Sequence, residues 1–222
     1  MGQKKRRCNV YKFATPAQVM RFANVFVRQR TSDFKKNVDI CLAARKTRLN
    51  DVDHAYMPGL MTCLSFLDLL SGLYAGKVRG HNDVHFLDFT RRFFPKGRYE
   101  EDHLRLLYIE FRHKLAHLAH PYFVLDAPPN PSTGARRLMA WTICARSRKK
   151  PIEIKSHPRK QLCQQPTPWE TYYDYRFYVS VESLARDARK STRGPNGYLS
   201  ALAASPDLQA KFRRCMSAFY PT

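Results

Sequence analysis

The sequence lacks several features that would assign a protein class directly. It has six cysteines in 222 residues but no C-x-x-C pair, which argues against a zinc or disulfide framework and favours reduced cysteines in a cytoplasmic protein. No apolar segment follows the basic start of the chain, so we expect no signal peptide. The most apolar run, residues 58–76, contains Asp68. A charge at that place predicts a buried core helix rather than a membrane span.

Acidic residues are scarce relative to basic ones. The chain has 18 Asp and Glu against 39 Lys and Arg, a formal net charge of +21 and a pI near 10.0. Such an excess attracts polyanions, and nucleic acid is the simplest of these. The composition is 44% hydrophobic and 13% aromatic, enough to build a core, so a disordered chain is not expected.

Hydrophobic periodicity and turn residues predict a mainly α fold with one small β element. We expect a basic tail over residues 1–14 and a single helical domain over 15–222, with a loop and β-hairpin inserted at about 127–160. The hairpin strands are predicted at 137–146 and 152–157. One helix is expected to start at Thr15-Pro16. Further helices are expected over 32–44, 58–74, 83–94, 100–118 and 172–190, with one or two more over 197–219.

The helix predicted over 100–118 carries the most informative pattern in the chain. Arg112 lies five residues before His117, with no Gly or Pro between them. The arginine fork matches a phosphate, and histidine can give and take a proton near neutral pH. A similar spacing occurs in three other places, but only Arg112 and His117 lie in a strongly periodic apolar helix; the others are Arg48/His54, Arg79/His85 and Arg98/His103.

A helical wheel divides this helix into two apolar faces. One face is the expected core stripe and includes Leu107, Tyr108 and Phe111; the opposite face carries Leu106 and Ile109, followed by histidines. We expect the second face to pack against a second copy of the chain. Arg112 and His117 are about 140° apart on an ideal α-helix, so one phosphate would be reached by an arginine from one chain and a histidine from the other.

The histidines allow three interpretations. His113, His117 and His120 could bind a metal, but Lys114 stands where a zincin would have glutamate and no cysteine or carboxylate completes the set, so no metal or other cofactor is expected. The histidines could instead be structural. In the third interpretation, His117 is a general acid or base and Arg112 binds the phosphate. The structural alternative for Arg112 is a surface ion pair with an acid such as Glu110 or Asp102.

The segment Phe111-Arg112-His113-Lys114-Leu115-Ala116-His117 resembles the HEPN superfamily, whose signature is R-x(4–6)-H with a polar residue straight after the arginine. Residues 59–76 and the helix beginning near 172 resemble further core helices of that family.

The resemblance implies an up-down helical bundle that dimerises around paired motifs. It also implies a metal-independent RNase of toxin–antitoxin or defence systems, with an antitoxin as a possible partner. In some of these toxins a partner enzyme modifies a tyrosine two residues after the histidine; here Ala119 stands at that position.

The expected catalytic residues are therefore Arg112 and His117, supported by His113. The expected RNA contacts are Arg91, Arg92, Arg136 and Arg137. The alternative is a catalytically inactive module that binds nucleic acid or a protein partner.

Overall fold

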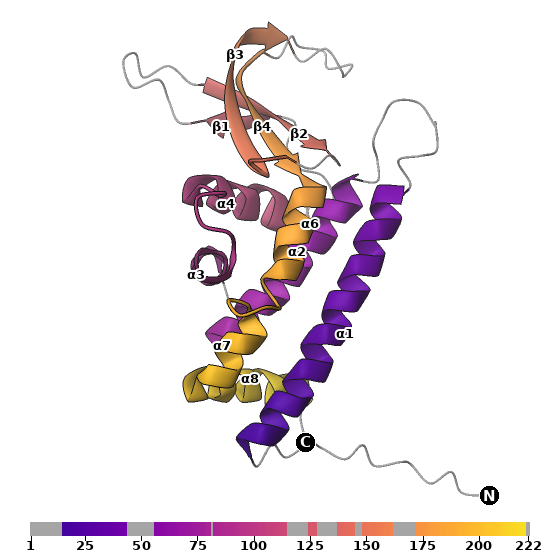
Figure 1. The fold of residues 1–222 in the computed structure, drawn as a ribbon. Coiled ribbons are helices and arrows are strands. Elements are labelled where there is room, and N and C mark those ends of the chain that lie inside the picture. The colour runs from indigo at the N-terminus through magenta and orange to yellow at the C-terminus, as the bar shows by residue number, and fades with distance from the viewer. Residues whose placement is uncertain are drawn as a thin grey trace, which may run out of the picture.

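The protein is mostly helical, with a small β-sheet at one end (Figure 1). This computed structural model describes residues 15–43, 56–80, 82–114, 124–127, 137–144, 148–161 and 172–220, so the predicted basic tail over 1–14 lies outside the described residues. The elements in chain order are α1 (Pro16–Ala43), α2 (Tyr56–Ala75), α3 (Asp83–Phe93), α4 (Glu101–Leu107), the π-helix η2 (Tyr108–Lys114), β1 (Val124–Ala127), β2 (Arg137–Cys144), β3 (Ile152–Gln161), β4 (Tyr172–Ser180), α6 (Val181–Lys190), α7 (Tyr198–Ala204) and α8 (Pro206–Phe219).

The central helix is α2, which packs against α1, α3, α6 and α8. It is long and apolar enough to cross a membrane by length and composition, but 67% of its most apolar window is buried inside the protein. It therefore forms the core helix predicted from the sequence. It ends at Gly76, whose φ of 75° lies in the left-handed region that favours glycine.

The prediction of two helices between Thr15 and Ala44 is wrong, because α1 is one continuous helix. The residues Thr31, Ser32 and Asp33 are typical of a helix start. Here the Thr31 hydroxyl instead donates to the Val27 carbonyl one turn earlier, at 2.6 Å, and is buried against Thr192. The polar side chain is thus satisfied within the helix and does not interrupt it.

The sheet is not the predicted hairpin. Strands do form at both predicted places, but β2 and β3 are not neighbours, since the strand order is β1-β2-β4-β3. The strand β4 lies between them, parallel to β2 and antiparallel to β3. Its inward residues Phe177 and Val179 are fully buried, which explains its central position.

The helix predicted over 172–190 is helical only in its second half. Residues 172–180 form β4, and Ser180 then caps α6 by accepting a hydrogen bond from the Ser183 backbone N–H at 3.3 Å. The run Tyr172–Ser180 is rich in tyrosine and other β-formers, and pairing on both sides stabilises it as a strand. The remaining predicted helices are confirmed: α2, α3, and a pair, α7 and α8, meeting at Pro206.

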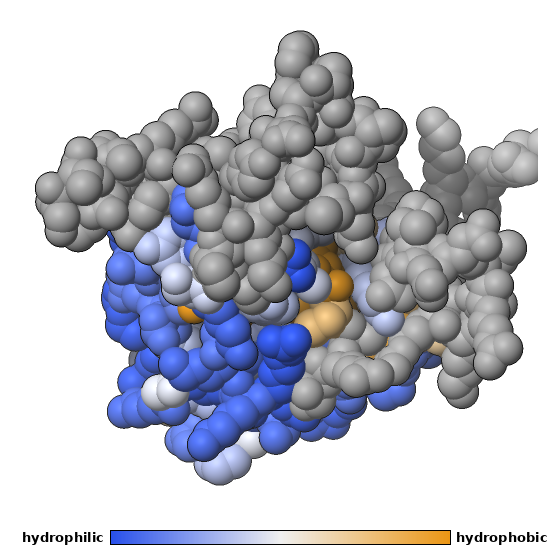
Figure 2. Space-filling view, turned by 90° about the horizontal axis from the view of Figure 1, so that it is seen from above, coloured by the Kyte–Doolittle hydropathy of each residue, from blue (hydrophilic) through white to orange (hydrophobic). Residues whose placement is uncertain are grey.

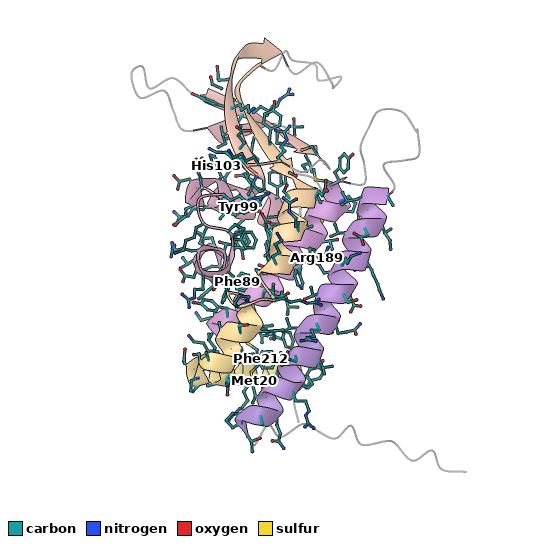
Figure 3. All side chains as sticks on the ribbon, in the orientation of Figure 1. Met20, Phe89, Tyr99, His103, Arg189 and Phe212 are labelled. Atoms are coloured by element: carbon teal, nitrogen blue, oxygen red, sulfur yellow. The ribbon has the colours of Figure 1, made fainter. Side chains whose placement is uncertain are left out.

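Aromatic side chains fill much of the helical core. At the end away from the sheet, Phe212 of α8 contacts both Phe22 and Phe26 of α1, with ring centroids 6.4 and 6.3 Å away (Figure 3). The opposite, sheet end is seen in Figure 2, where the described surface is mostly hydrophilic with a small hydrophobic patch. The two long helices α1 and α2 connect these ends (Figure 1).

Candidate active site

The segment that carries Arg112 changes its helical geometry where the motif begins. The predicted helix over 100–118 is α-helical from Glu101 to Leu107 and π-helical from Tyr108 to Lys114. Its last predicted residues, 115–118, lie outside the described residues. Short π-helical segments are rare and frequently occur at functional sites. A π-helix has a wider turn than an α-helix, so the side chains from Tyr108 to Lys114 do not follow the α-helical spacing; the predicted 140° separation of Arg112 and His117 involves a residue outside the described part of the chain.

The π-helix is anchored to the sheet by Phe111. This side chain is buried, stacks on Phe177 of β4 with a centroid distance of 5.9 Å, and meets Trp141 of β2 edge-on at 5.8 Å. Together with Leu107 and Tyr108 it forms the predicted core stripe, and all three are at most 1% exposed. The sheet therefore fixes the position of the neighbouring Arg112.

Arg112 forms an ion pair with Asp68 of α2. Its Nε donates to Asp68 Oδ2 at 2.7 Å, while 31% of the arginine side chain stays exposed against 13% of the aspartate. The structural alternative named Glu110 or Asp102 as the partner, and that choice of acid is wrong. A bond through Nε uses one of five N–H donors, so the four donors on the terminal nitrogens remain available to another anion.

Tyr108 completes this cluster. Its ring is buried, and the Arg112 guanidinium carbon lies 5.9 Å from the ring centroid. Burial, and secondly the negative charge of Asp68, raises the pKa of Tyr108 to about 12. We call Arg112, Asp68 and Tyr108 the open cluster, because its arginine is partly exposed.

The sequence does contain a signal for the role of Asp68, namely its position within the apolar run 58–76. An aspartate within an apolar helix is rarely buried without a partner, so the core-helix prediction for 58–76 implied a cation nearby. The spacing within one segment could not identify Arg112, because the two residues are 44 positions apart. Tyr108 was predicted only as a core residue.

The other predicted catalytic residues lie largely outside the described part of the chain. His117 is not described, and of His113 only the backbone is placed, within the π-helix. Among the described residues there is no group of three or more His, Cys, Asp or Glu that could hold a metal. The arrangement of His113, His117 and His120 thus remains a prediction.

The four arginines predicted to contact RNA lie in different environments. Arg91 is held by two carboxylates, Asp88 at 2.9 Å and Glu101 at 2.8 Å. The hydrogen bond and charge of Glu101 raise the pKa of Arg91. Arg92 is exposed at the end of α3. Arg136 lies outside the described residues, and only the backbone of Arg137 is placed, in β2. Because two carboxylates already pair with it, Arg91 is a poor candidate for a phosphate contact.

A second cluster with the same three residue types lies between the α3–α4 connection and α6. Asp187 of α6 is 1% exposed. It forms an ion pair with Arg98, whose Nε lies 2.9 Å from Asp187 Oδ2, and it accepts a hydrogen bond from the hydroxyl of Tyr99 (labelled in Figure 3) at 2.8 Å. Burial, and then the charge of Asp187, raises the pKa of Tyr99. Arg98 also donates from Nη2 to the Arg148 carbonyl at 3.0 Å. We call Arg98, Asp187 and Tyr99 the closed cluster, because its carboxylate is enclosed.

Two of the competing arginine–histidine pairs have structural roles. His85 Nδ1 accepts from the Asn82 backbone N–H at 3.1 Å and so helps to cap α3. His103 Nε2 lies 3.4 Å from Glu100, and Arg98 belongs to the closed cluster. The pair Arg48/His54 lies outside the described residues.

No protein-family model, curated protein or solved structure matches the chain.

Proposed function

We propose that this protein is a metal-independent endoribonuclease of the HEPN type, with Arg112 and His117 as its catalytic pair. The observation that carries the proposal is the open cluster. Asp68 holds Arg112 through Nε while part of the guanidinium side chain stays exposed, which is the arrangement needed for an arginine that binds a phosphate.

The chemistry needs one proton carrier and one permanent cation. His117 takes the proton from the ribose 2′-hydroxyl, whose oxygen attacks phosphorus as the bond to the 5′-oxygen breaks, and the leaving 5′-oxygen receives a proton from the imidazolium so formed or from water. Arg112 offsets the negative charge that builds on the phosphorane oxygens. The products are a 2′,3′-cyclic phosphate and a 5′-hydroxyl, and His113 supports the site as a polar neighbour.

A dimer through the 100–118 face is part of this proposal. Ile109 is 41% exposed on the π-helix that carries Arg112, whereas Leu106 is partly buried and packs against the core. An exposed isoleucine beside the site supports a contact with a second copy. Ile109→Lys should convert a dimer to a monomer in sedimentation experiments; an unchanged sedimentation coefficient would place the interface elsewhere.

The second candidate function is a catalytically inactive module that binds nucleic acid or a protein. It is favoured by the likeness of the open cluster to the closed one, since an arginine held by a carboxylate can be purely structural. For the RNase, the HEPN resemblance implies a toxin or defence role with an antitoxin as a possible partner, whereas an inactive member would act as a binding scaffold.

Cleavage of labelled RNA in EDTA separates the two candidates. Wild-type protein should cleave single-stranded or structured RNA and leave 2′,3′-cyclic phosphate ends, and His117→Ala should abolish cleavage while the far-UV circular dichroism stays unchanged. The control is His103→Ala, because His103 follows Arg98 at the same spacing and should be dispensable. Intact RNA after incubation with wild-type protein would support the inactive module.

A further inference from the structure

The α3–α4 side of the molecule, where the sequence placed Arg91 and Arg92, is electrically balanced. Residues 83–107 contain five Lys and Arg and five Asp and Glu. Several of these charges neutralise each other: Arg91 pairs with Asp88 and Glu101, and Arg105 lies 3.7 Å from Asp83. The large positive charge of the chain is therefore not concentrated here.

The seam between α1 and α6 has a different charge pattern. The Thr31 hydroxyl contacts the Thr192 hydroxyl at 3.4 Å, which fixes the two segments side by side. Arg28 lies one turn before Thr31, Arg189 lies one turn before Thr192, and Arg193 follows it. These three arginines are exposed, and none forms an ion pair within the described part of the chain.

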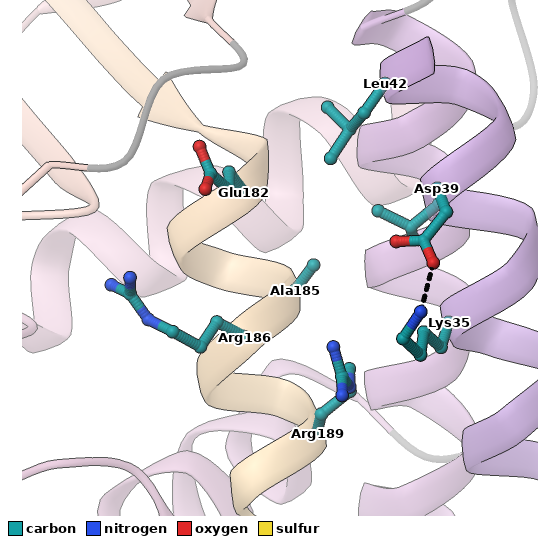
Figure 4. A pocket seen from close by; sticks show the side chains of 8 residues that line it. Lys35, Asp39, Leu42, Glu182, Ala185, Arg186 and Arg189 are labelled. Carbon is teal, nitrogen blue, oxygen red and sulfur yellow. Dashed lines mark hydrogen bonds and ion pairs between the residues drawn. The ribbon is translucent and has the colours of Figure 1, made fainter.

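A cavity of about 430 Å³ continues along the same seam. Lys35 of α1 and Arg189 of α6 face each other across it (Figure 4), and Arg186 also lines it. Its two carboxylates are Asp39, which pairs with Lys35, and Glu182 in the first turn of α6. The apolar lining residues are buried or only half-buried, namely Val38, Leu42 and Ala185.

We propose that this seam binds the phosphodiester backbone of RNA; its residues Arg28, Lys35, Arg189 and Arg193 are called the α1–α6 basic surface. The inference rests on the proposed function and adds a docking site remote in sequence from Arg112. Unpaired exposed arginines along a groove match successive phosphates. An anionic membrane fits less well, because the apolar residues that line the cavity, Val38, Leu42 and Ala185, are buried or half-buried.

Fluorescence anisotropy with a labelled single-stranded RNA tests this surface in a His117→Ala background, so that the RNA stays intact. The triple variant Arg28→Gln, Arg189→Gln and Arg193→Gln should bind at least tenfold more weakly. Its plot of log affinity against log salt should be shallower by about 2, as expected for three lost contacts to a single strand. The matched control removes three cations from the balanced side, with Arg91→Gln, Lys96→Gln and Arg105→Gln, and should bind within about twofold of the parent.

Equal losses in both triple variants would overturn the inference, because the affinity would then follow net charge alone. Binding of the parent to anionic phosphatidylglycerol vesicles, lost in the α1–α6 variant while RNA binding persists, would overturn it as well. Cleavage is scored separately with the histidine restored. If RNA binding depends on this surface but the protein cleaves no RNA, the surface is supported and the RNase proposal is contradicted. If the protein cleaves RNA but binding does not depend on this surface, the RNase proposal is supported and the surface is contradicted.

Discussion

The protein contains two clusters made of the same three residue types, an arginine, an aspartate and a tyrosine, whose carboxylates differ in burial. In the closed cluster Asp187 is 1% exposed and receives both Arg98 and Tyr99. In the open cluster Asp68 is 13% exposed and Arg112 is 31% exposed. Arg98 of the closed cluster is 24% exposed and donates from Nη2 to the Arg148 carbonyl, whereas Arg112 of the open cluster donates to Asp68 from Nε.

The difference indicates that the arginine–aspartate ion pair stabilises the fold in the closed cluster and orients a partly exposed arginine in the open cluster. The closed cluster joins the α3–α4 connection to α6 and, through Arg98 and the Arg148 carbonyl, to the segment that leads into β3. Removing one partner there leaves a buried charge uncompensated. In the open cluster, solvent can compensate part of the loss, so the main consequence should fall on the orientation of Arg112.

The largest expected effect is on stability in the closed cluster. Asp187→Ala should lower the free energy of unfolding by about 3–5 kcal/mol, because the charge of Arg98 loses its buried counter-ion and the Tyr99 hydroxyl loses its acceptor. Urea denaturation measures this loss. Asp68→Ala is the matched control and should cost about 1 kcal/mol, since its pair is partly exposed. Equal losses in the two variants would remove the distinction between the clusters.

The next effect is on catalysis in the open cluster. Asp68→Asn keeps an acceptor oxygen but removes the charge that holds Arg112, so cleavage should fall roughly 10- to 100-fold, as for the loss of a charged hydrogen bond. The loss should be in kcat, and Asp68→Glu should restore part of it. If Asp68→Asn cleaves like wild type, Asp68 does not position the arginine.

The smallest expected effect is a pH dependence from Tyr108. Burial and Asp68 raise the pKa of Tyr108 to about 12 in the folded protein, above the value of about 10 for an unfolded tyrosine. Its contribution to stability is complete below pH 10 and is lost as the pH rises toward 12. Between pH 10 and pH 12, the free energy of unfolding of the wild type should therefore fall by about 2 kcal/mol more than that of Tyr108→Phe.

The exposed Tyr220 provides the control for that experiment. Tyr220→Phe should leave the alkaline slope of the wild type unchanged. Identical slopes for Tyr108→Phe and wild type would mean that the environment of Tyr108 does not favour its protonated form.

The sequence predicted those parts of the fold in which local pattern and tertiary packing agree. The helices α2, α3, α7 and α8 have clear starts or stops, such as Gly76 and Pro206, and were predicted correctly. The strand Tyr172–Ser180 was missed because its apolar spacing fits a helix as well, and only pairing with β2 and β3 decides between them. The helix start predicted at residue 32 does not exist, because the Thr31 hydroxyl is buried against Thr192, a residue of a distant segment that local pattern cannot identify.

The candidate site shows the same limit. The sequence identified Arg112 as the residue of interest and placed Phe111 and Tyr108 on the core side of its helix. It did not assign Asp68 as the partner, because local spacing cannot pair residues of different helices. The π-helix was not predicted either, since the sequence pattern of residues 108–114 resembles an ordinary amphipathic helix.

The most direct test compares the conservative change Arg→Lys in both clusters, with unfolding and RNA cleavage measured on the same preparations. Lysine keeps the charge but lacks the planar fork. We predict that Arg112→Lys loses cleavage and keeps the wild-type free energy of unfolding within about 1 kcal/mol, and that Arg98→Lys is destabilised but still cleaves in its folded fraction. Wild-type cleavage by Arg112→Lys, or a destabilisation of Arg112→Lys as large as that of Arg98→Lys, would contradict the functional role of the open cluster.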